Sequence, residues 1–528
     1  MKRHVVIHPF LFAVYPLLEL FYKLSPNVVF WDILRPLGIV LLLAGGVFGG
    51  LGFVTKQWPR AGFFTTLLLF VLLFYGAIYR VAWNVTLFGV RVGTHAILFP
   101  LWASLIAFLG FGLGKPRVWH RFQGDTLITD FLNIVAGVAI VISLGRYLIG
   151  LSQMQAVNSQ MVQSVMETRE ADLHLKADVR PDIYYIVLDG YARQDVLQQL
   201  YGVDNAGFIG ALRERGFYVA EKSRSNYIQT VLSLASSLNF SYLSNLSVDS
   251  ADRLALLPLI WDSTARRGLQ ELGYQFVSVN SGYSFTSIAN ADVYFSPTAT
   301  GLFNTYEEMV LMSTSAVVLV DSGLLPLYRT GYAAHRRFVV SAFEFLHETP
   351  ALPGPTFTFF HIVSPHPPFV LDRDGNPVPA GAPFEGGRDG SYFPGSTVEY
   401  IAGYKEKLLY TNQQLLRAID AILAASDSAP IIILQADHGP GAWLQWDSIE
   451  ETCLLERTSI FNAYYLPAGG AENLYPDITP VNTFRVIFNA YFGTDLPLLA
   501  DEIYFSSWDR PYDFVNVTDQ AVLPCDLP

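Results

Sequence analysis

The chain has 528 residues, of which 51% are hydrophobic, and its formal net charge is −12 at pH 7. The charge is unevenly divided, because residues 1–150 carry 12 Lys+Arg and 4 Asp+Glu whereas residues 151–528 carry 22 and 42. The acidic second part excludes nucleic acid as a partner, since nucleic-acid binding needs a basic surface.

The first 150 residues contain five apolar stretches, and most approach the roughly 20 residues needed to cross a hydrocarbon core. We therefore predict a helical transmembrane domain of about five spans over residues 1–150. The first stretch is the shortest and is interrupted by Pro16. The predicted spans are residues 9–22, 33–54, 61–79, 95–113 and 128–149.

Basic residues are concentrated at one side of these spans, and an excess of Lys and Arg marks the cytoplasmic side. The N-terminus and the loops 55–60 and 115–127 are therefore expected inside, and the chain leaves the fifth span outside. This predicts a multi-pass protein of a bacterial cytoplasmic (inner) membrane, with residues 181–528 facing the periplasm or exterior. The basic residues that set the orientation are Lys2, Arg3, Lys56, Arg60, Lys115, Arg117 and Arg121.

Residues 151–180 are predicted to form a juxtamembrane amphipathic linker. Apolar residues recur there at spacings typical of one helix face, among Gln, Ser and Asn, so the helix leans on the membrane or on the following domain. Pro181 closes this segment. The apolar residues are Met154, Val157, Met161, Val165 and Met166.

Residues 181–528 alternate between strand-like and helix-like segments, which predicts an α/β domain with a mostly parallel sheet and helices on both faces. The Gly- and Pro-rich segment 372–396 is predicted to be a long loop that could cover a site. The expected strands are 183–189, 217–220, 274–280, 357–363, 431–436, 460–466 and 502–505. The expected helices are 193–201, 206–215, 230–246, 252–272, 331–347, 397–425 and 479–492.

Two strand ends and one helix start carry residues with a shared chemistry. Asp189 ends the run Ile-Val-Leu-Asp-Gly, Asp437 and His438 follow Ile-Ile-Ile-Leu-Gln-Ala, and Thr230 opens an apolar helical run. Open α/β sheets bind ligands beyond the carboxyl ends of their strands, so these residues are expected to meet. Two carboxylates and an imidazole suit a divalent cation such as Zn or Mn, beside which a hydroxyl becomes a nucleophile.

The assignment of Thr230 as the nucleophile has alternatives. It could serve only as a helix N-cap, and Ser225 and Ser233 are competing nucleophiles. Ser233 lies one turn inside the expected helix, where its hydroxyl is expected to bond back to the backbone. Thr230 is favoured because a helix N-terminus offers free N–H groups to an incoming phosphate.

Four of these features in order, Asp-Gly, Thr at a helix start, His-Pro-Pro-Phe and Asp-His-Gly, resemble the alkaline phosphatase superfamily. With the preceding spans, the chain looks most like the membrane-anchored sulfatase-like branch. That branch includes lipoteichoic acid synthases, phosphoglycerol transferases and lipid A phosphoethanolamine transferases. The resemblance implies that one divalent metal ion, Zn or Mn, is held by Asp189, Thr230, Asp437 and His438. It also implies that Thr230 is the nucleophile.

The resemblance further places His366 where relatives hold substrate phosphate or a leaving group. His361, inside the same expected strand, is either a second substrate contact or a satisfied core group. Arg224 and Asn226, with Lys222, precede Thr230 and either contact phosphate oxygens or belong to a solvated loop.

Two departures from the pattern narrow the chemistry. The chain lacks the Cys or Ser followed by x-Pro-x-Arg that formylglycine sulfatases need, since Cys453-Leu-Leu-Glu-Arg457 has no proline. No histidine follows His438, so a single metal is expected rather than two.

The two cysteines, Cys453 and Cys525, both fall in the outward domain. An oxidising compartment permits a disulfide between them, which would tie the C-terminal tail to the segment before Ile460. The alternative is two buried thiols.

These observations predict an enzyme that transfers a phospholipid-derived head group, of phosphoglycerol or phosphoethanolamine type, through a covalent phospho-threonine. Its partners would be the lipid bilayer, a phospholipid donor and a glycan or lipid acceptor. A phosphodiesterase or other hydrolase, and a catalytically degenerate membrane-anchored scaffold, remain alternatives. We expect His438 to set the acid limb of activity, with Asp189 and Asp437 ionised throughout.

Overall fold

The computed structural model describes residues 5–24, 30–83, 85–88, 90–121, 127–168, 175–177, 179–243, 246, 251–297, 301–379, 382–384 and 387–525. The chain divides into two compact units. We call residues 1–153, 299–331 and 381–384 the membrane unit, and the remaining residues, which contain the central sheet, the α/β unit.

The membrane unit is helical. Its elements are α1 (His8–Leu24), α2 (Phe30–Thr55), α3 (Trp58–Ala82), the hairpin β1 (Thr86–Leu87) and β2 (Val90–Arg91), α4 (His95–Gly114), α5 (Pro116–Arg121), the first part of α6 (Thr129–Thr168), α12 (Thr305–Ser313) and α13 (Val317–Asp321).

Three helices in the described part of the chain are long and apolar enough to cross a membrane: Trp31–Thr55, Trp58–Ala82 and Thr129–Ile149. They correspond to the predicted spans 33–54, 61–79 and 128–149. The other two predicted spans are also helical, but the apolar part of α4 is the shorter segment His95–Phe111 and α1 has only 17 residues.

The predicted linker 151–180 does not begin as a separate helix, because α6 runs without interruption from Thr129 to Thr168. Residues 151–168 contain neither Gly nor Pro, so nothing in the sequence ends the helix there. The side chains of 151–168, including the apolar ones expected to line one face, and residues 169–174 lie outside the described structure.

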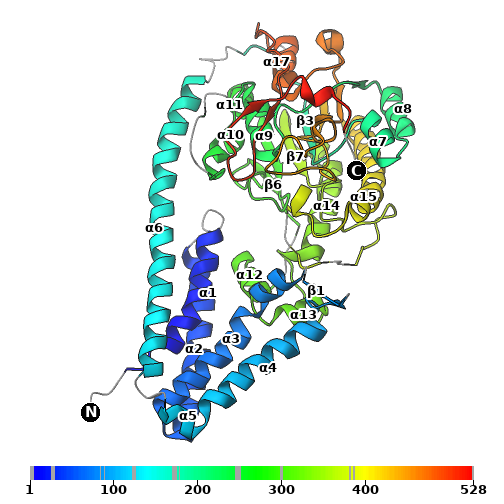
Figure 1. Cartoon of the computed structure of the whole chain (residues 1–528). Coiled ribbons are helices and arrows are strands. Elements are labelled where there is room, and N and C mark those ends of the chain that lie inside the picture. Colours follow the sequence, from blue (N-terminus) through cyan, green and yellow to red (C-terminus); the bar gives the residue numbers. More distant parts are fainter. Residues whose placement is uncertain are drawn as a thin grey trace. The chain divides into compact units, whose positions relative to one another are not determined.

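The α/β unit is built on a seven-stranded sheet with the order β4-β9-β8-β3-β7-β5-β6. Figure 1 labels three of these strands, β3, β6 and β7. Most neighbouring strands are parallel, and β9 is antiparallel to both of its neighbours. The strands are β3 (Ile183–Leu188), β4 (Tyr218–Val219), β5 (Gln275–Val279), β6 (Val293–Phe295), β7 (Thr356–Ile362), β8 (Ile431–Gln435) and β9 (Asn462–Tyr465).

Helices cover both faces of the sheet, as predicted. Alternate side chains of each strand point to opposite faces, so β3 gives Ile186 and Leu188 to one core and Tyr185 and Val187 to the other. The first core includes α7 (Gln194–Tyr201), α8 (Ala206–Glu214), α14 (Gly331–Glu348) and α15 (Thr397–Ala425). The second includes α9 (Thr230–Asn239), α10 (Leu257–Trp261), α11 (Thr264–Glu271) and α17 (Pro480–Tyr491).

Some predicted boundaries were wrong. The helix expected over 230–246 ends at Asn239, because Phe240 adopts a left-handed conformation. The helix expected over 252–272 breaks into a short 3-10 turn, α10 and α11, since Pro258 lies at the start of α10 and Ser263 caps α11. The segment 502–505 forms β10 (Tyr504–Phe505), which pairs with β11 (Val515–Asn516) outside the main sheet.

The register of the central strands positions the site. Ile183 of β3 lies beside Ile431 of β8 in a parallel pair. The same register continued to the strand ends sets Asp189 beside Asp437. On the other side of β3, Val187 lies beside His361 of β7.

Candidate active site

Asp189 and Asp437 meet at the carboxyl end of the sheet, as predicted. Both side chains are buried, at 4% and 0% exposure. Asp437 Oδ1 accepts hydrogen bonds from the backbone N–H groups of Gly190 (3.1 Å) and His438 (2.9 Å). The Asp437 carboxylate, which follows β8, is therefore held in part by the backbone of Gly190, which follows the neighbouring strand β3.

Thr230 lies at this point, at the start of α9. It is the first residue of the helix, and the N-cap position belongs to Gln229, so the N-cap interpretation of Thr230 was wrong. Thr230 Oγ1 is 3.1 Å from His438 Nε2. Thr230 is only partly buried, so a substrate can approach its hydroxyl while the carboxylates stay enclosed.

The two competing serines lie elsewhere. The backbone N–H of Ser225 donates to the carbonyl of Thr458 at 2.7 Å, and its hydroxyl faces the same carbonyl at 3.5 Å. Ser233 is buried, and its hydroxyl has no hydrogen-bond partner among the described residues, contrary to the expected bond to the backbone.

The ring orientation of His438 suits a metal ligand. Nδ1 is 2.9 Å from the carbonyl oxygen of Gly439 and donates to it, which leaves the Nε2 lone pair free to accept. Nε2 faces Asp189 Oδ1 at 3.5 Å and Asp437 Oδ2 at 3.4 Å.

Two further histidines reach the same centre. His361 Nδ1 bonds Thr286 Oγ1 at 2.9 Å, and its Nε2 faces Asp189 Oδ2 at 3.5 Å. His366 Nδ1 donates to the carbonyl of Pro367 at 2.6 Å. His366 also belongs with Asp189 and His438 to a group whose ligand atoms all lie within 4.8 Å of one another, and Asp189, His361 and Asp437 form a second such group.

Three buried atoms at this centre have no hydrogen-bond partner in the described structure: Asp189 Oδ1, Asp437 Oδ2 and His361 Nε2. Buried polar atoms are costly unless they are satisfied, and carboxylate oxygens with imidazole nitrogens are ligands of divalent metals. The residues therefore fit a divalent cation. Asp189, Asp437 and His438 would hold it, with His361 and His366 within reach.

The charges at the site lead to the same conclusion. Burial raises the pKa of Asp189 well above its usual value, and the neighbouring Asp437 raises it further. Burial raises the pKa of Asp437 to about 6 and lowers the pKa of His438 well below its usual value. The expectation that the carboxylates stay ionised while His438 titrates is therefore reversed in the metal-free protein, because burial penalises two adjacent anions and keeps the imidazole neutral.

A buried ion pair, missed in the sequence, adjoins His366 and acts on His438. Arg457 Nη1 donates to Asp389 Oδ2 at 2.5 Å and to the carbonyl of Gly439 at 2.9 Å, and Nε donates to the carbonyl of Ile228 at 2.9 Å. Asp389 Oδ2 is 3.6 Å from His366 Nε2. Burial opposes the charge of Asp389, but Arg457 and His366 hold its pKa below the usual value.

The sequence held a weak signal for both residues. Asp389 lies in the loop 372–396, which was predicted to cover a site, and Arg457 ends the segment that failed to match the formylglycine pattern. The Arg457 Nη2 group makes no hydrogen bond with the described part of the chain, although its other donors are engaged. Arg457 therefore brings a fixed positive charge to the anionic centre.

The segment that carries His366 is fixed by Lys407 of α15. The Lys407 ammonium is fully buried and donates to the carbonyls of Val363 (2.9 Å), His366 (2.7 Å) and Pro368 (3.1 Å). Burial lowers the pKa of Lys407 to about 7. Lys407 Nζ also lies 3.3 Å from His335 Nε2. Its bonds to three carbonyls of the segment 363–368 make Lys407 a positioning residue for His366.

The Asp-His-Gly motif needs its glycine for space. A Cβ on Gly439 would lie 2.0 Å from the carbonyl oxygen of Glu456, closer than real atoms approach. The loop after β8 therefore lies directly against α16 (Leu454–Thr458), the helix that carries Arg457.

Arg224 and Asn226 are not brought to the centre. Asn226 is buried, and its amide bonds Tyr242, Thr479, the carbonyl of Glu502 and the N–H of Val481. Arg224 Nη1 donates to the carbonyl of Thr518. Contact of these two side chains with a substrate remains a prediction.

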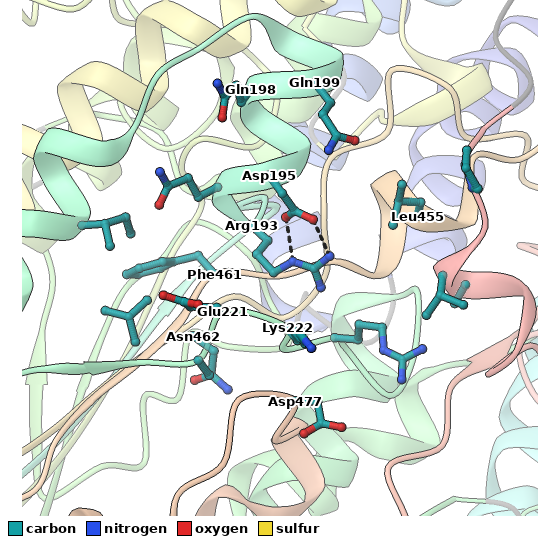
Figure 2. Close-up of a pocket in the computed structure, with 18 of the residues that line it drawn as sticks. Arg193, Asp195, Gln198, Gln199, Glu221, Lys222, Leu455, Phe461, Asn462 and Asp477 are labelled. Carbon is teal, nitrogen blue, oxygen red and sulfur yellow. Dashed lines mark hydrogen bonds and ion pairs between the residues drawn. The ribbon is translucent and has the colours of Figure 1, made fainter.

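Arg224 and Lys222 line a separate cavity of about 820 Å³ beside the start of α7 (Figure 2). None of the residues that line it belongs to the Asp189–His438 centre. Arg193 and Asp195 face each other there in a two-bond ion pair of 2.7 and 2.8 Å. This cavity is thus distinct from the site where the chemistry is concentrated.

The predicted disulfide between Cys453 and Cys525 is present. It closes a separation of 72 residues and joins the C-terminal tail to the residue that caps α16.

A buried carboxylate–imidazole centre that could hold a metal ion, at the strand ends of a mostly parallel α/β sheet, is the arrangement found in α/β metalloenzymes. Comparison with known protein families narrows that class, because the model of the Sulfatase family matches residues 181–485. The match covers more than half of the chain, and the chain belongs to the sulfatase family, within the alkaline phosphatase superfamily. No curated protein is similar enough in sequence to count as a match.

Several solved structures are similar to this chain. The C-terminal periplasmic domain of EptC from Escherichia coli, in complex with Zn, is 15% identical with a TM-score of 0.41 and covers 65% of this chain and 94% of its own. The corresponding domain of phosphoethanolamine transferase EptC from Campylobacter jejuni is 13% identical with a TM-score of 0.36, covering 59% and 90%. The integral membrane protein lipooligosaccharide phosphoethanolamine transferase A from Neisseria meningitidis is 12% identical with a TM-score of 0.36, covering 92% and 95%.

Proposed function

We propose that this sulfatase-family protein transfers a phospholipid-derived head group, of phosphoglycerol or phosphoethanolamine type, at the outer face of the cytoplasmic membrane. The observation that carries the proposal is the position of Thr230. Its side chain is only partly buried, and its hydroxyl lies 3.1 Å from His438 Nε2, next to two buried carboxylates. The membrane-spanning helices of the same chain support a lipid donor.

A divalent cation bound by Asp189, Asp437 and His438 would supply positive charge that favours the alkoxide form of Thr230 and neutralises phosphate oxygens. In the first step, Thr230 Oγ1 forms a bond to the phosphorus of the head-group phosphodiester, and the bond from phosphorus to the diacylglycerol oxygen breaks. The threonine proton passes to water, and the diacylglycerol oxygen takes a proton from Nε2 of His366, which has to enter this step as the imidazolium because its Nδ1–H is bonded to Pro367.

In the second step, an acceptor hydroxyl attacks the phospho-threonine. The acceptor proton passes to His366, and the bond from phosphorus to Thr230 breaks, so that the threonine recovers its proton from water. A glycan or lipid hydroxyl makes the reaction a transfer, and water makes it a hydrolysis. Both outcomes use the same residues.

Arg457 is suited to hold the phosphate in both steps. Its Nε and Nη1 groups are fixed by Ile228, Gly439 and Asp389, which leaves Nη2 for a phosphate oxygen. A guanidinium held by the protein stabilises the charge that develops on the phosphoryl group without reorganising during the reaction.

The test is a pair of variants at residue 230. Thr230→Ala should abolish turnover of a labelled phospholipid, whereas Thr230→Ser, which keeps a hydroxyl, should retain part of it. The expected signature in the unmodified protein is a phosphorylated peptide containing Thr230, seen by mass spectrometry after rapid acid quenching. Ser233→Ala is the matched control on the same helix and should keep full activity. Turnover by Thr230→Ala would reject Thr230 as the nucleophile.

Metal content separates the enzyme from a degenerate scaffold. The purified full-length protein should contain one equivalent of Zn or Mn, and Asp437→Ala should lose it while remaining folded. A protein that stays metal-free at saturating Zn and Mn would favour a scaffold. The three buried, unsatisfied atoms at the centre support the enzyme.

A further inference from the structure

Residues 301–327 leave the α/β unit after β6 and return to it at α14, yet they pack within the membrane unit. We propose that α12 and α13 form a re-entrant hairpin in the outer leaflet of the bilayer, with leucine side chains in contact with lipid acyl chains. The outer leaflet here is the leaflet on the side where α6 leaves the membrane. The inference concerns lipid contact and does not depend on the reaction proposed above.

α12 is anchored between the membrane helices. Tyr306 is buried, its hydroxyl donates to the carbonyl of Leu17 in α1 at 2.7 Å, and its ring packs edge-on against Phe21. Glu307 is buried and forms an ion pair with Arg35 of α2. These contacts hold the start of α12 beside the last turns of α1 and the first turns of α2.

The chain then descends along α3. The N–H of Ser315 donates to the carbonyl of Leu72 at 2.8 Å. Leu72 lies ten residues before the end of α3, which is about 15 Å at 1.5 Å per residue. α3 has 25 residues, about 37 Å, and a hydrocarbon core is about 30 Å thick. Ser315 therefore lies roughly 10 Å inside the hydrocarbon.

Gly76 of α3 makes this approach possible. A Cβ at Gly76 would lie 2.4 Å from the carbonyl oxygen of Met312 and from the carbonyl carbon of Ser313. Small residues allow helices in membranes to approach closely. The backbone of the hairpin thus rests directly on the backbone of α3.

The turn between α12 and α13 satisfies its own polar groups, as hydrocarbon requires. The N–H of Thr314 bonds the carbonyl of Leu311, and those of Val317 and Val318 bond the carbonyls of Thr314 and Ser315. Asp321, at the end of α13, accepts from Tyr79 (3.1 Å) and faces His95 Nε2 (2.9 Å).

Glu308 of α12 is fully buried and binds the segment through which the chain leaves the hairpin. Its carboxylate accepts the N–H groups of Tyr328, Arg329 and Thr330 at 2.7–2.8 Å. Contacts with its surroundings therefore fix both ends of the hairpin.

Its outer surface carries exposed leucines, together with the exposed Asp321 and Ser322 at the end of α13. Leu302, Leu319 and Leu324 are exposed by 84%, 47% and 76%. The exposure of Leu302 and Leu324 is comparable to that of Leu42 in the span α2, which is exposed by 78%. Leu319 of α13 follows Ser315 by four residues, close to the depth that the bond from Ser315 to Leu72 sets, so acyl chains fit as the partner of this exposed leucine.

The orientation follows from the membrane unit alone. Phe21 of α1 packs against Tyr147 of α6, and Glu19 pairs with Arg146, whereas Asn133 bonds the start of α1 at His8. α6 therefore leaves the membrane at the end where α1 ends. Tyr306 lies at that same end.

The test uses single cysteines labelled with bimane in the full-length protein, reconstituted in phosphatidylcholine vesicles with spin-labelled lipids. Leu319→Cys and Leu324→Cys should be quenched by spin labels on the acyl chain to the same extent as Leu42→Cys. The matched control is Val398→Cys on α15, exposed by 77% in the α/β unit, which should not be quenched. Quenching of the hairpin positions at the level of Val398→Cys would overturn the proposal.

A second variant tests whether the hairpin packs on α3 at Gly76. Gly76→Leu should expel the hairpin and reduce quenching at Leu324→Cys severalfold. Gly46→Leu on α2, where a side chain meets nothing within 4 Å, is the matched control and should leave it unchanged. Equal quenching in both glycine variants would show that the hairpin does not rest on α3, and would contradict the inferred depth.

Discussion

The Arg457 guanidinium and the Asp389 carboxylate are both about 99% buried, so each charge depends on the other. Removing one partner of a buried pair leaves an uncompensated charge and costs about 3–5 kcal/mol, whereas replacing both by apolar groups costs far less. The pair therefore contributes to the site by positioning the Arg457 charge, and it adds little net free energy of folding.

We expect Arg457→Met to lower the free energy of unfolding by about 3–5 kcal/mol and to abolish turnover. The double variant Arg457→Met with Asp389→Leu should recover most of the stability and none of the activity. Calorimetry of the full-length protein in detergent measures the first, and lipid turnover the second. Arg373→Met, which breaks an exposed ion pair with Glu406, is the control and should change neither. A double variant no more stable than Arg457→Met would reject this account.

The acid limb of activity is a second prediction at this scale. Burial raises the pKa of Asp437 to about 6 and also raises that of Asp189 above its usual value, so acidification protonates metal ligands and releases the metal. Activity should fall below about pH 6, and the limb should move to lower pH as free metal rises, because bound metal opposes protonation. A hundredfold increase in metal should move it by up to about two pH units for one competing proton. A limb that stays in place would mean that no metal ligand titrates there.

Local signals account for what the sequence predicted at the site. Asp189, Asp437 and His438 directly follow buried strands, and Thr230 opens a helix, so short motifs sufficed to bring them together. Asp389 and Arg457 are 68 residues apart and meet only through tertiary packing. No local pattern marks such a pair.

At the scale of elements, the long amphipathic and β-branched segments of the α/β unit were predicted well. Short or interrupted elements were not: β6 has three residues and α16 has five. α12 and α13 were missed, since no helix or strand was predicted between residues 280 and 331. Their helical structure depends on the membrane helices that surround them.

The disulfide gives a prediction for α16. Cys525→Ser should lower the free energy of unfolding by about 4 kcal/mol, the loop entropy of a 72-residue closure. Activity should fall as well, because α16 carries Arg457 and packs against the tail helix Gln520–Val522. Calorimetry with and without reductant measures the effect. The double variant with Cys453→Ser should no longer respond to reductant, and an unchanged transition in Cys525→Ser would show that the tail is held by other contacts.

At the scale of the whole molecule, the charge pattern and the helices predict that residues 181–528 lie outside the cytoplasm. Protease added to intact spheroplasts should remove this part of the chain and leave the loops 55–60 and 115–127 protected. Both regions should be cut after lysis. Protection of residues 181–528 in intact spheroplasts would reverse the orientation and remove the proposed access to outer-leaflet lipid.

The return of residues 299–331 to the membrane unit limits how this protein can be divided or recombined. A fragment that begins at residue 181 would keep Tyr306 and Glu307 but lose the helices that bury them, and we expect it to self-associate. Replacing 299–331 with a short flexible linker should make that fragment monodisperse. For the same reason, exchanging membrane anchors between related proteins should preserve packing only when this distant segment is exchanged with α1–α3. Two stretches more than 200 residues apart in the sequence are thus expected to be inherited as one module.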